Sequence, residues 1–230
     1  MKPIVKLASA PTPDGKLLTL YSRDRDFFIR LDRQELMNSR ENESEMELAR
    51  LGCARIAGHS TPNVLIGGLG MGYTLRQTLD LLQPGARVVV AELVPEVVQW
   101  NRDFLGALTG HPLRDPRVEL KVCDVVDIIR RSPGAFDAIL LDTDNGPAAM
   151  TTDSNDRLYN RHGVQDCSAA LTAKGCLAIW AADMDPSFEG RLQQAKLHFR
   201  ACRVATHKGG RGRTRCIWIA SQDRNTLPPR

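Results

Sequence analysis

The chain has 230 residues, of which 42% are hydrophobic and 25% charged, an ordinary composition for one globular domain with a small appendage. Its net charge of +4 is too small to indicate a nucleic-acid binder by itself. No stretch reaches the roughly 20 apolar residues that a transmembrane helix needs. Residues 1–10 also lack the long apolar segment of a signal peptide, so the sequence predicts a cytoplasmic protein with no membrane partner.

The first 60 residues are predicted to form a small N-terminal region. Apolar runs at 17–21 and 27–31 flank a polar segment, which predicts a β-hairpin. Asn38 and Ser39 are candidate caps of a helix that extends from Ser44 to Ile56.

Residues 61–230 alternate between apolar strand patterns and helical patterns. The predicted strands are 63–68, 87–92, 118–123, 136–142, 175–181, 202–207 and 215–220. The predicted helices are 73–83, 95–108, 125–131, 161–173 and 187–199. Such βα repeats indicate an α/β fold with a parallel, Rossmann-like sheet and ligands at the carboxyl ends of its strands. The last two strands have no helix between them, which predicts an antiparallel hairpin at one end. This seven-stranded layout is typical of S-adenosylmethionine-dependent transferases rather than of dehydrogenases.

A glycine-rich turn follows the first of these strands and contains Gly67, Gly68, Gly70 and Gly72. Glycine allows positive φ and lets a ligand approach the backbone, and the next helix offers N–H groups at its start. The same turn also occurs in parallel α/β proteins that bind nothing there. Glu92 favours a nucleoside site, because it ends the next strand 20 residues after Gly72, where a carboxylate can bind ribose hydroxyls.

Acidic residues also follow the third and fourth strands. Asp124 can accept a hydrogen bond from an adenine amine, or it can cap the helix that follows. Asp142, Asp144 and Asn145 lie in a turn after a fully apolar strand. An acid in this turn could orient or deprotonate an amine nucleophile, although the same residues are strong turn formers. The carboxyl ends of the strands are expected to form a ligand-binding crevice. Asp142 is expected at its floor, where it would anchor either the turn or the bound ligand that donates a group. Asp144 is expected farther out from the strand than Asp142, and so in a better position to contact the amine nucleophile that accepts the group.

Two charged segments have alternative interpretations. Four acids between Glu41 and Glu47 would attract a cationic acceptor if they faced the crevice. Otherwise they form a solvated helix start that the helix dipole favours. The basic segment from His207 to Arg215 is interpreted as a loop rather than a nucleic-acid site, because aromatic stacking residues are absent from it. Its arginines could alternatively cover the crevice.

The six cysteines lack zinc-ligand spacing, so no metal is predicted, and most lie in apolar runs as expected for buried free thiols.

A series of short motifs extends from about Leu17 to Ala220. They are Leu31-Asp32, Ile66-Gly-Gly with Thr74-Leu-Arg76, Glu92-Leu-Val-Pro-Glu-Val-Val98, Asp115-Pro-Arg-Val118, Asp124-Val, Phe136-Asp-Ala-Ile-Leu-Leu-Asp142, Leu158-Tyr159 and Ala173-Lys-Gly-Cys-Leu-Ala178. With these motifs the sequence resembles the spermidine synthase (polyamine aminopropyltransferase) family.

The resemblance implies an N-terminal β-domain, a Rossmann-like domain and a homodimer. It also implies a donor, S-adenosylmethionine or its decarboxylated form, and alkyl transfer to a small amine. By resemblance Glu92 would bind ribose and Asp124 adenine. Asp144 or Asn145 would take the catalytic acid position, and Glu45, Glu47 and Tyr159 would bind the acceptor.

Four positions depart from the family pattern. Where the family has an aspartate that holds the cationic aminopropyl end of the donor, this chain has Met71. A hairpin glutamine is replaced by Leu36, and a Tyr-His pair by Glu45-Met46. Because Met71 tolerates a methionine carboxylate better than aspartate does, ordinary S-adenosylmethionine is expected to bind at least as well as the decarboxylated form. Aminopropyl-type transfer and methyl transfer to a small molecule therefore both stay open, ahead of a non-catalytic nucleoside or nucleic-acid binder.

Overall fold

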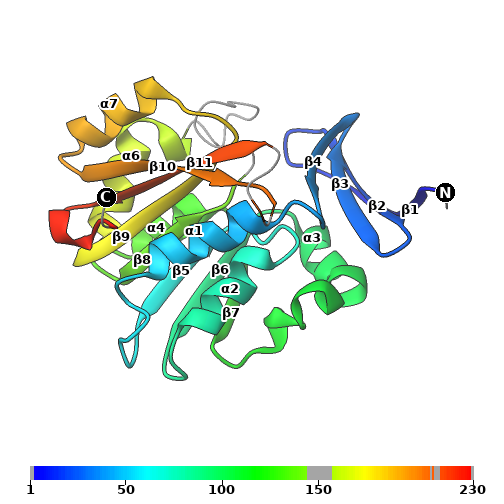
Figure 1. Cartoon of the computed structure of the whole chain (residues 1–230), viewed down its shortest axis with the longest axis horizontal. Coiled ribbons are helices and arrows are strands. Elements are labelled where there is room, and N and C mark those ends of the chain that lie inside the picture. Colours follow the sequence, from blue (N-terminus) through cyan, green and yellow to red (C-terminus); the bar gives the residue numbers. More distant parts are fainter. Residues whose placement is uncertain (1–2, 144–156, 208, 210–212, 229–230) are drawn as a thin grey trace.

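The computed structural model describes residues 3–143, 157–207, 209 and 213–228. These residues form a four-stranded antiparallel sheet at the N-terminal end and a seven-stranded mixed sheet with helices on both faces (Figure 1). The fold class predicted from the sequence is thereby confirmed. Within the described ranges, no helix combines the length and the apolarity needed to cross a bilayer.

The N-terminal sheet contains the predicted hairpin and two further strands. Its strands are β1 (Val5–Pro11), β2 (Leu17–Arg23), β3 (Asp26–Leu31) and β4 (Gln34–Asn38), hydrogen-bonded in that order. β2 and β3 are the predicted hairpin, which is confirmed. The flanking strands β1 and β4 are edge strands and mostly exposed or half-buried. They therefore lack the strong apolar alternation by which strands are recognised in a sequence.

Helix α1 (Glu43–Cys53) connects the two sheets and begins later than the predicted capping residues. Asn42 occupies its N-cap position, so the prediction of a cap at Asn38 or Ser39 is wrong. Asn38 is the last residue of β4, and the Ser39 hydroxyl accepts a hydrogen bond from the backbone N–H of Phe27 over 2.9 Å. Both residues are thus used to close the N-terminal sheet.

The larger sheet has the predicted connectivity. Its strands are β5 (Asn63–Gly67), β6 (Arg87–Glu92), β7 (Val118–Val122), β8 (Phe136–Leu141), β9 (Leu171–Ala181), β10 (His198–Ala205) and β11 (Thr214–Ser221). Their order is β10-β11-β9-β8-β5-β6-β7. β11 is antiparallel to both of its neighbours, and the other pairs are parallel. The predicted antiparallel hairpin at one end of the sheet is confirmed.

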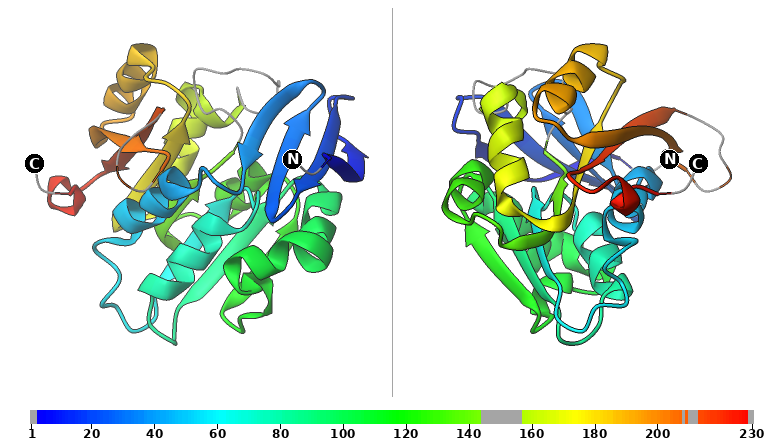
Figure 2. Two further views of the ribbon diagram at one scale, coloured as in Figure 1. Left: turned by 45° about the vertical axis from the view of Figure 1, so that its right-hand side comes forward. Right: turned by 90° about the vertical axis from the view of Figure 1, so that its left-hand side faces the viewer.

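Helices cover both faces of this sheet (Figures 1 and 2). They are α1, α2 (Tyr73–Leu81) and α3 (Pro95–Trp100) on one face, and α4 (Val125–Arg131), α6 (Arg161–Ala170) and α7 (Pro186–Gln194) on the other. β5 shows why both faces are covered: Val64 and Ile66 belong to the core under α1 and α2, and Leu65 belongs to the core under α4 and α6. A strand buried on both faces reads as a continuous apolar run, as β5 does.

Two helices end earlier than the sequence pattern suggested. α6 ends at Ala170 because Leu171 already pairs with Phe136 of β8. α7 ends at Gln194, and Lys196 then adopts a positive φ of 57° that turns the chain into β10. In both cases tertiary packing stops a helix that local propensity would continue.

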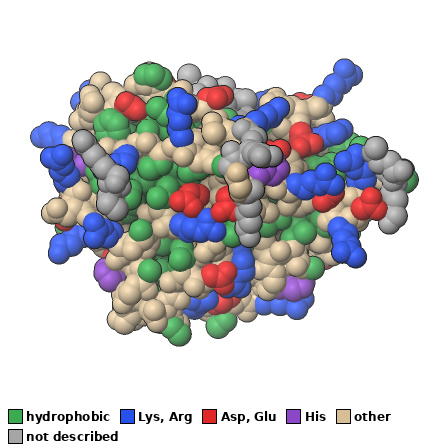
Figure 3. All heavy atoms as spheres, viewed as in Figure 1, with side chains coloured by type: hydrophobic (Ala, Val, Ile, Leu, Met, Phe, Trp, Pro, Cys, Tyr) green, Lys and Arg blue, Asp and Glu red, His purple; other side chains and the backbone are tan. Residues whose placement is uncertain are grey.

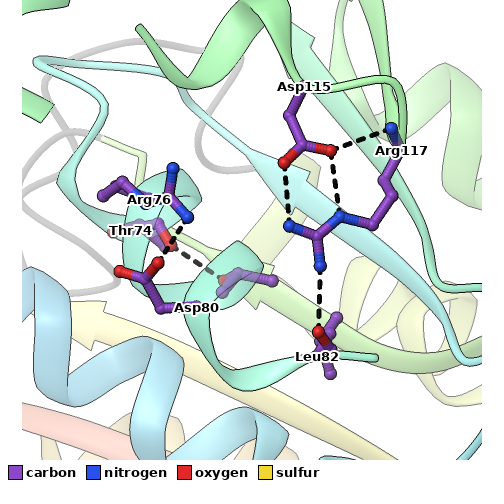
Figure 4. Close-up of polar contacts among 7 residues, drawn as sticks. Thr74, Arg76, Asp80, Leu82, Asp115 and Arg117 are labelled. Atoms are coloured by element: carbon purple, nitrogen blue, oxygen red, sulfur yellow. Dashed lines mark hydrogen bonds and ion pairs between the residues drawn. The ribbon is translucent and has the colours of Figure 1, made fainter. Parts of the chain in front are cut away.

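The motif Asp115-Pro-Arg-Val118 has a structural role (Figure 4). The Arg117 guanidinium donates to both carboxylate oxygens of Asp115, over 2.9 and 2.8 Å, and to the carbonyl oxygen of Leu82 over 2.9 Å. The arginine also lowers the pKa of the Asp115 carboxyl below its usual range. This bidentate pair ties the end of α2 to the start of β7, away from the carboxyl ends of the strands.

Candidate functional site

A cleft lies between the N-terminal sheet and the carboxyl ends of β5, β6, β7 and β8; we call it the central cleft. Its N-terminal wall is apolar and includes Leu18, Ile29, Leu31 and Leu36. Its other side is formed by residues that the sequence singled out, namely Gly68, Gly70, Glu92, Asp124 and Asp142. Gly67 and Gly72 belong to the same turn but do not line the cleft. The carboxyl edge of the sheet thus brings together the acids of three different strands, as expected for a ligand site of this fold.

Gly68 allows the ends of β5 and β8 to approach each other closely. Its φ is +93°, and a Cβ at this position would overlap the carbonyl oxygen of Asp142. The N–H of Asp142 also donates to the carbonyl oxygen of Gly67 over 2.8 Å. Because only glycine fits both the dihedral angle and the contact, Gly68 fixes the place of Asp142 at the floor of the cleft.

Glu92 is buried and helps to shape the glycine turn. Its two carboxylate oxygens accept hydrogen bonds from the backbone N–H groups of Leu69 and Val94, each over 2.9 Å. Glu92 also lines the central cleft. Glu92 therefore holds the turn and lines the cleft at the same time.

Asn101 supports the glycine turn from outside the two cavities, and the sequence analysis missed it. Its amide nitrogen donates to the carbonyl oxygens of Gly70 and Val97, over 2.8 and 2.9 Å. The predicted helix 95–108 is accordingly interrupted: α3 ends at Trp100 and continues as a π-turn and a 3-10 turn. A buried asparagine within an apolar helical pattern was the available signal, since such a residue needs partners outside its own helix.

Asp124 has the capping role, which is one of the two alternatives that the sequence left open. Its carboxylate accepts a hydrogen bond from the N–H of Val126 over 2.9 Å and thereby caps α4. It also lines the central cleft. The cap uses Oδ1, and Oδ2 lies 3.8 Å from the Arg157 guanidinium. A contact between Asp124 and an adenine amine stays a prediction.

A smaller pocket adjoins the central cleft and contains two carboxylates; we call it the acidic pocket. Glu45, Met71, Tyr73 and Asp142 line it, and Asp142 belongs to both cavities. The Thr74 hydroxyl donates to Asp142 Oδ2 over 2.6 Å. The acidic pocket is therefore a side chamber of the cleft that begins at Asp142.

Helix geometry explains why Glu45 faces this pocket while its neighbours do not. Glu43 and Glu47 both pair with Arg50, over 2.6 and 3.0 Å. Glu45 is two residues from each of them, about 200° around the helix, and so points to the opposite side. Glu41 lies outside the helix, 3.6 Å from His207. Of the four acids in this segment, Glu45 faces the acidic pocket, and the other three lie beside basic side chains.

The two carboxylates of the acidic pocket hold their protons more tightly than usual. Burial raises the pKa of Glu45 to about 7, with a further contribution from the nearby Asp142 carboxylate, while Ser44 and Arg215 oppose the shift. Burial also raises the pKa of Asp142 to about 6, against the hydrogen bond from Thr74. Two like charges in a poorly solvated pocket disfavour ionisation of both. A bound cation would remove this penalty.

This pair makes stability fall as pH rises. The native carboxyls have pKa values above their ordinary 4.5 and 3.8, so their contribution is complete below pH 4 and is lost as pH rises to about 7. Glu45→Gln removes one of the two charges. We expect the melting temperature of the wild type to fall relative to that of Glu45→Gln between pH 5 and pH 8, as measured by circular dichroism. A difference that stays constant or changes sign would contradict this.

Tyr159 and Glu47, two further predicted site residues, line neither of the two cavities. Tyr159 is buried, and its hydroxyl lies 2.6 Å from the hydroxyl of Thr143, which lines the central cleft. Glu47 is paired with Arg50 and does not line either cavity. Asp144 and Asn145 lie outside the described residues. Tyr159 thus supports the cleft from behind, through Thr143.

Charge on the surface is mixed. Lysine and arginine side chains alternate with acidic ones over the face seen in Figure 3. In the basic segment, Arg215 lies over the Trp180 ring at 5.6 Å from its centroid.

Among the residues that the structure describes, no group of three or more His, Cys, Asp or Glu side chains could hold a metal ion.

Comparison with known proteins identifies relatives of this chain. A family model described as the spermine/spermidine synthase domain matches residues 51–194. The polyamine aminopropyltransferase 2 of Pseudomonas aeruginosa is 31% identical over 134 residues, which are 56% of this chain and 36% of the relative. The polyamine aminopropyltransferase of Thermococcus onnurineus is 34% identical over 95 residues, 40% of this chain and 33% of the relative. The chain thus matches about a third of the length of these curated relatives.

Solved structures share the fold. The spermidine synthase of Thermotoga maritima superimposes with a TM-score of 0.71 and 20% identity, over 97% of this chain and 76% of its own. A spermidine synthase in complex with the transition-state analogue AdoDATO gives a TM-score of 0.75 and 20% identity, over 97% and 77%. Because the family model covers more than half of the sequence, the chain belongs to the spermine/spermidine synthase family.

Proposed function

We propose that this chain binds a sulfonium nucleoside in the central cleft and transfers an aminopropyl-type alkyl group from it to a small amine. The donor is S-adenosylmethionine or its decarboxylated form. The observation that carries the proposal is the acidic pocket, which adjoins the cleft at Asp142 and holds two carboxylates. Membership of the family and the names of the curated relatives support the same reaction class.

The reaction needs the amine nitrogen, the sulfonium carbon and the leaving sulfur in line, with a proton acceptor near the amine. The amine nitrogen uses its lone pair to form a C–N bond, and the C–S bond breaks with its electron pair moving to sulfur. The products are an alkylated amine and a neutral thioether nucleoside. The amine is protonated in water and must lose a proton before it attacks, and a carboxylate can accept that proton. Asp142 lies where the cleft meets the acidic pocket and can hold the cationic amine until then.

The nucleoside end of the site is tested by Glu92→Ala. The variant is expected to bind methylthioadenosine more weakly by about 1.5–3 kcal/mol, the usual value of a hydrogen bond to a charged group. Calorimetry gives the affinity, and a thermal melt shows whether the variant is folded. Since Glu92 also bonds Leu69 and Val94, the milder Glu92→Gln should retain more of the fold. Glu96→Ala on α3 is the matched control. Unchanged affinity in a folded Glu92→Ala protein would contradict a ribose contact.

The reaction itself is tested by product analysis. The protein is incubated with S-adenosylmethionine or its decarboxylated form and a panel of primary diamines and polyamines, and products are identified by mass spectrometry. Release of methylthioadenosine together with an aminopropylated amine supports the proposal. Release of S-adenosylhomocysteine with a methylated amine would instead support methyl transfer, the alternative that Met71 favours. If the protein binds the nucleoside but forms neither product, the result would support a non-catalytic nucleoside-binding protein and contradict the proposed transfer.

A further inference from the structure

The acidic pocket contains a carboxylate from an unexpected element. Met71 lines this pocket from the glycine turn, is 3% exposed and belongs to the hydrophobic core. Its thioether cannot pair with an ammonium group. Glu45 lines the same pocket from helix α1, and the Ser44 hydroxyl donates to its Oε2 over 2.6 Å. The pocket therefore has a negative charge that the turn itself does not provide.

We infer that Glu45 supplies from α1 the carboxylate that the glycine turn lacks, and that it binds the ammonium end of a decarboxylated donor. This inference rests on the proposed function and specifies its donor. It assigns to Glu45 a specificity role, because the side chain contacts the donor at the end remote from the adenine.

The charges around Glu45 favour a cation in this position. Asp142 on β8 is the nearest acid, and Arg215 on β11 is the basic group that acts on Glu45. Tyr73 on α2 faces the pocket as a neutral phenol, since burial raises the pKa of its hydroxyl. Arg215, which acts on Glu45, is itself placed over the Trp180 ring. An ammonium group at Glu45 would relieve the repulsion between the two carboxylates and allow both to ionise.

The same charges oppose ordinary S-adenosylmethionine. Its methionine carboxylate would enter a pocket that already contains two carboxylates, and like charges at close range without compensation are costly. Met71 considered alone favours the ordinary donor, but the position of Glu45 reverses that expectation. The two donors differ by a single carboxylate, so Glu45 acts on the group that distinguishes them.

Calorimetry with three nucleosides tests this directly. We expect the wild type to bind decarboxylated S-adenosylmethionine at least about tenfold more tightly than the ordinary form, and Glu45→Gln to lose most of that preference. Methylthioadenosine carries neither the ammonium nor the carboxylate, so its affinity should be unchanged. Glu47→Gln, which alters the outward pair with Arg50, is the matched control and should keep the preference. Adding Met71→Asp to Glu45→Gln should restore it, because the charge returns to the turn.

The outcomes separate the inference from the proposed function. If Glu45→Gln binds methylthioadenosine normally and keeps the full preference, the role of Glu45 is wrong while nucleoside binding stands. If the wild type prefers ordinary S-adenosylmethionine, the inference is also wrong. If the wild type binds none of the three nucleosides, the proposed function itself fails. Should the double variant not fold, the comparison of Glu45→Gln with Glu47→Gln still decides the point.

Discussion

Asp142→Asn is expected to lower turnover by about 10²–10⁴-fold with the amine that reacts fastest in the panel, the range assigned to a general base. Asparagine keeps the size of the side chain and can still accept the hydrogen bond from Thr74, which spans 2.6 Å in the native protein. It removes the charge that attracts an amine cation and the site that can receive its proton. The rate is measured in single turnover, and methylthioadenosine affinity is measured on the same variant.

A matched control for Asp142 lies on the same strand. Asp137→Asn changes an acid at the opposite end of β8, where Asp137 accepts a hydrogen bond from the N–H of Asn63 over 2.9 Å. This variant should keep its turnover, although it can lose some stability. If Asp142→Asn instead retains the rate while methylthioadenosine binding collapses, Asp142 belongs to the nucleoside site and its proposed chemical role is wrong.

Gly68→Ala is expected to destabilise the protein by about 2–5 kcal/mol, the sum of backbone strain and steric overlap. The residue has a φ of +93°, and the new methyl group would overlap the carbonyl oxygen of Asp142. To relieve the overlap, the ends of β5 and β8 would have to separate, which would displace Asp142 from the floor of the cleft. We therefore expect nucleoside affinity to fall together with the free energy of unfolding, both measured on the purified variant.

Gly134 provides the control that separates strain from overlap. Its φ is also positive, at +64°, but an added Cβ would meet nothing within 4 Å. Gly134→Ala should therefore cost only the strain, about 1–2 kcal/mol, and leave the cleft intact. Equal losses for Gly68→Ala and Gly134→Ala in urea unfolding would show that the close approach of β5 and β8 contributes nothing.

The sheet and the nucleoside end of the site were predictable because each has a local sequence signal. β5 is a continuous apolar run, the glycines follow it directly, and Glu92 ends the next strand. Parallel topology then brings these segments to one edge, so local patterns are sufficient to place Gly68, Glu92 and Asp124 together. The edge strands β1 and β4 were missed because half-buried strands show little alternation.

The acidic pocket was predictable only as one of two interpretations of the acidic segment, the other being a solvated helix start. The segment around Glu45 reads as four similar acids, and the sequence does not show which side of α1 faces the sheet. The face became clear once Glu43 and Glu47 were seen to pair with Arg50. In the same way, nothing local shows that Asn101 reaches the carbonyl of Gly70, since that contact joins residues 31 positions apart. Long-range contacts of this kind follow from tertiary packing rather than from local pattern.

The two hydrogen bonds that Glu92 accepts from Leu69 and Val94 have a consequence for binding kinetics. They are internal to the fold, so the turn acquires its shape when the protein folds rather than when a nucleoside arrives. A preorganised site loses little conformational entropy on association. Association can then follow a single step at a rate set by diffusion and orientation, and differences in affinity among nucleosides would arise mainly from how long each one stays bound.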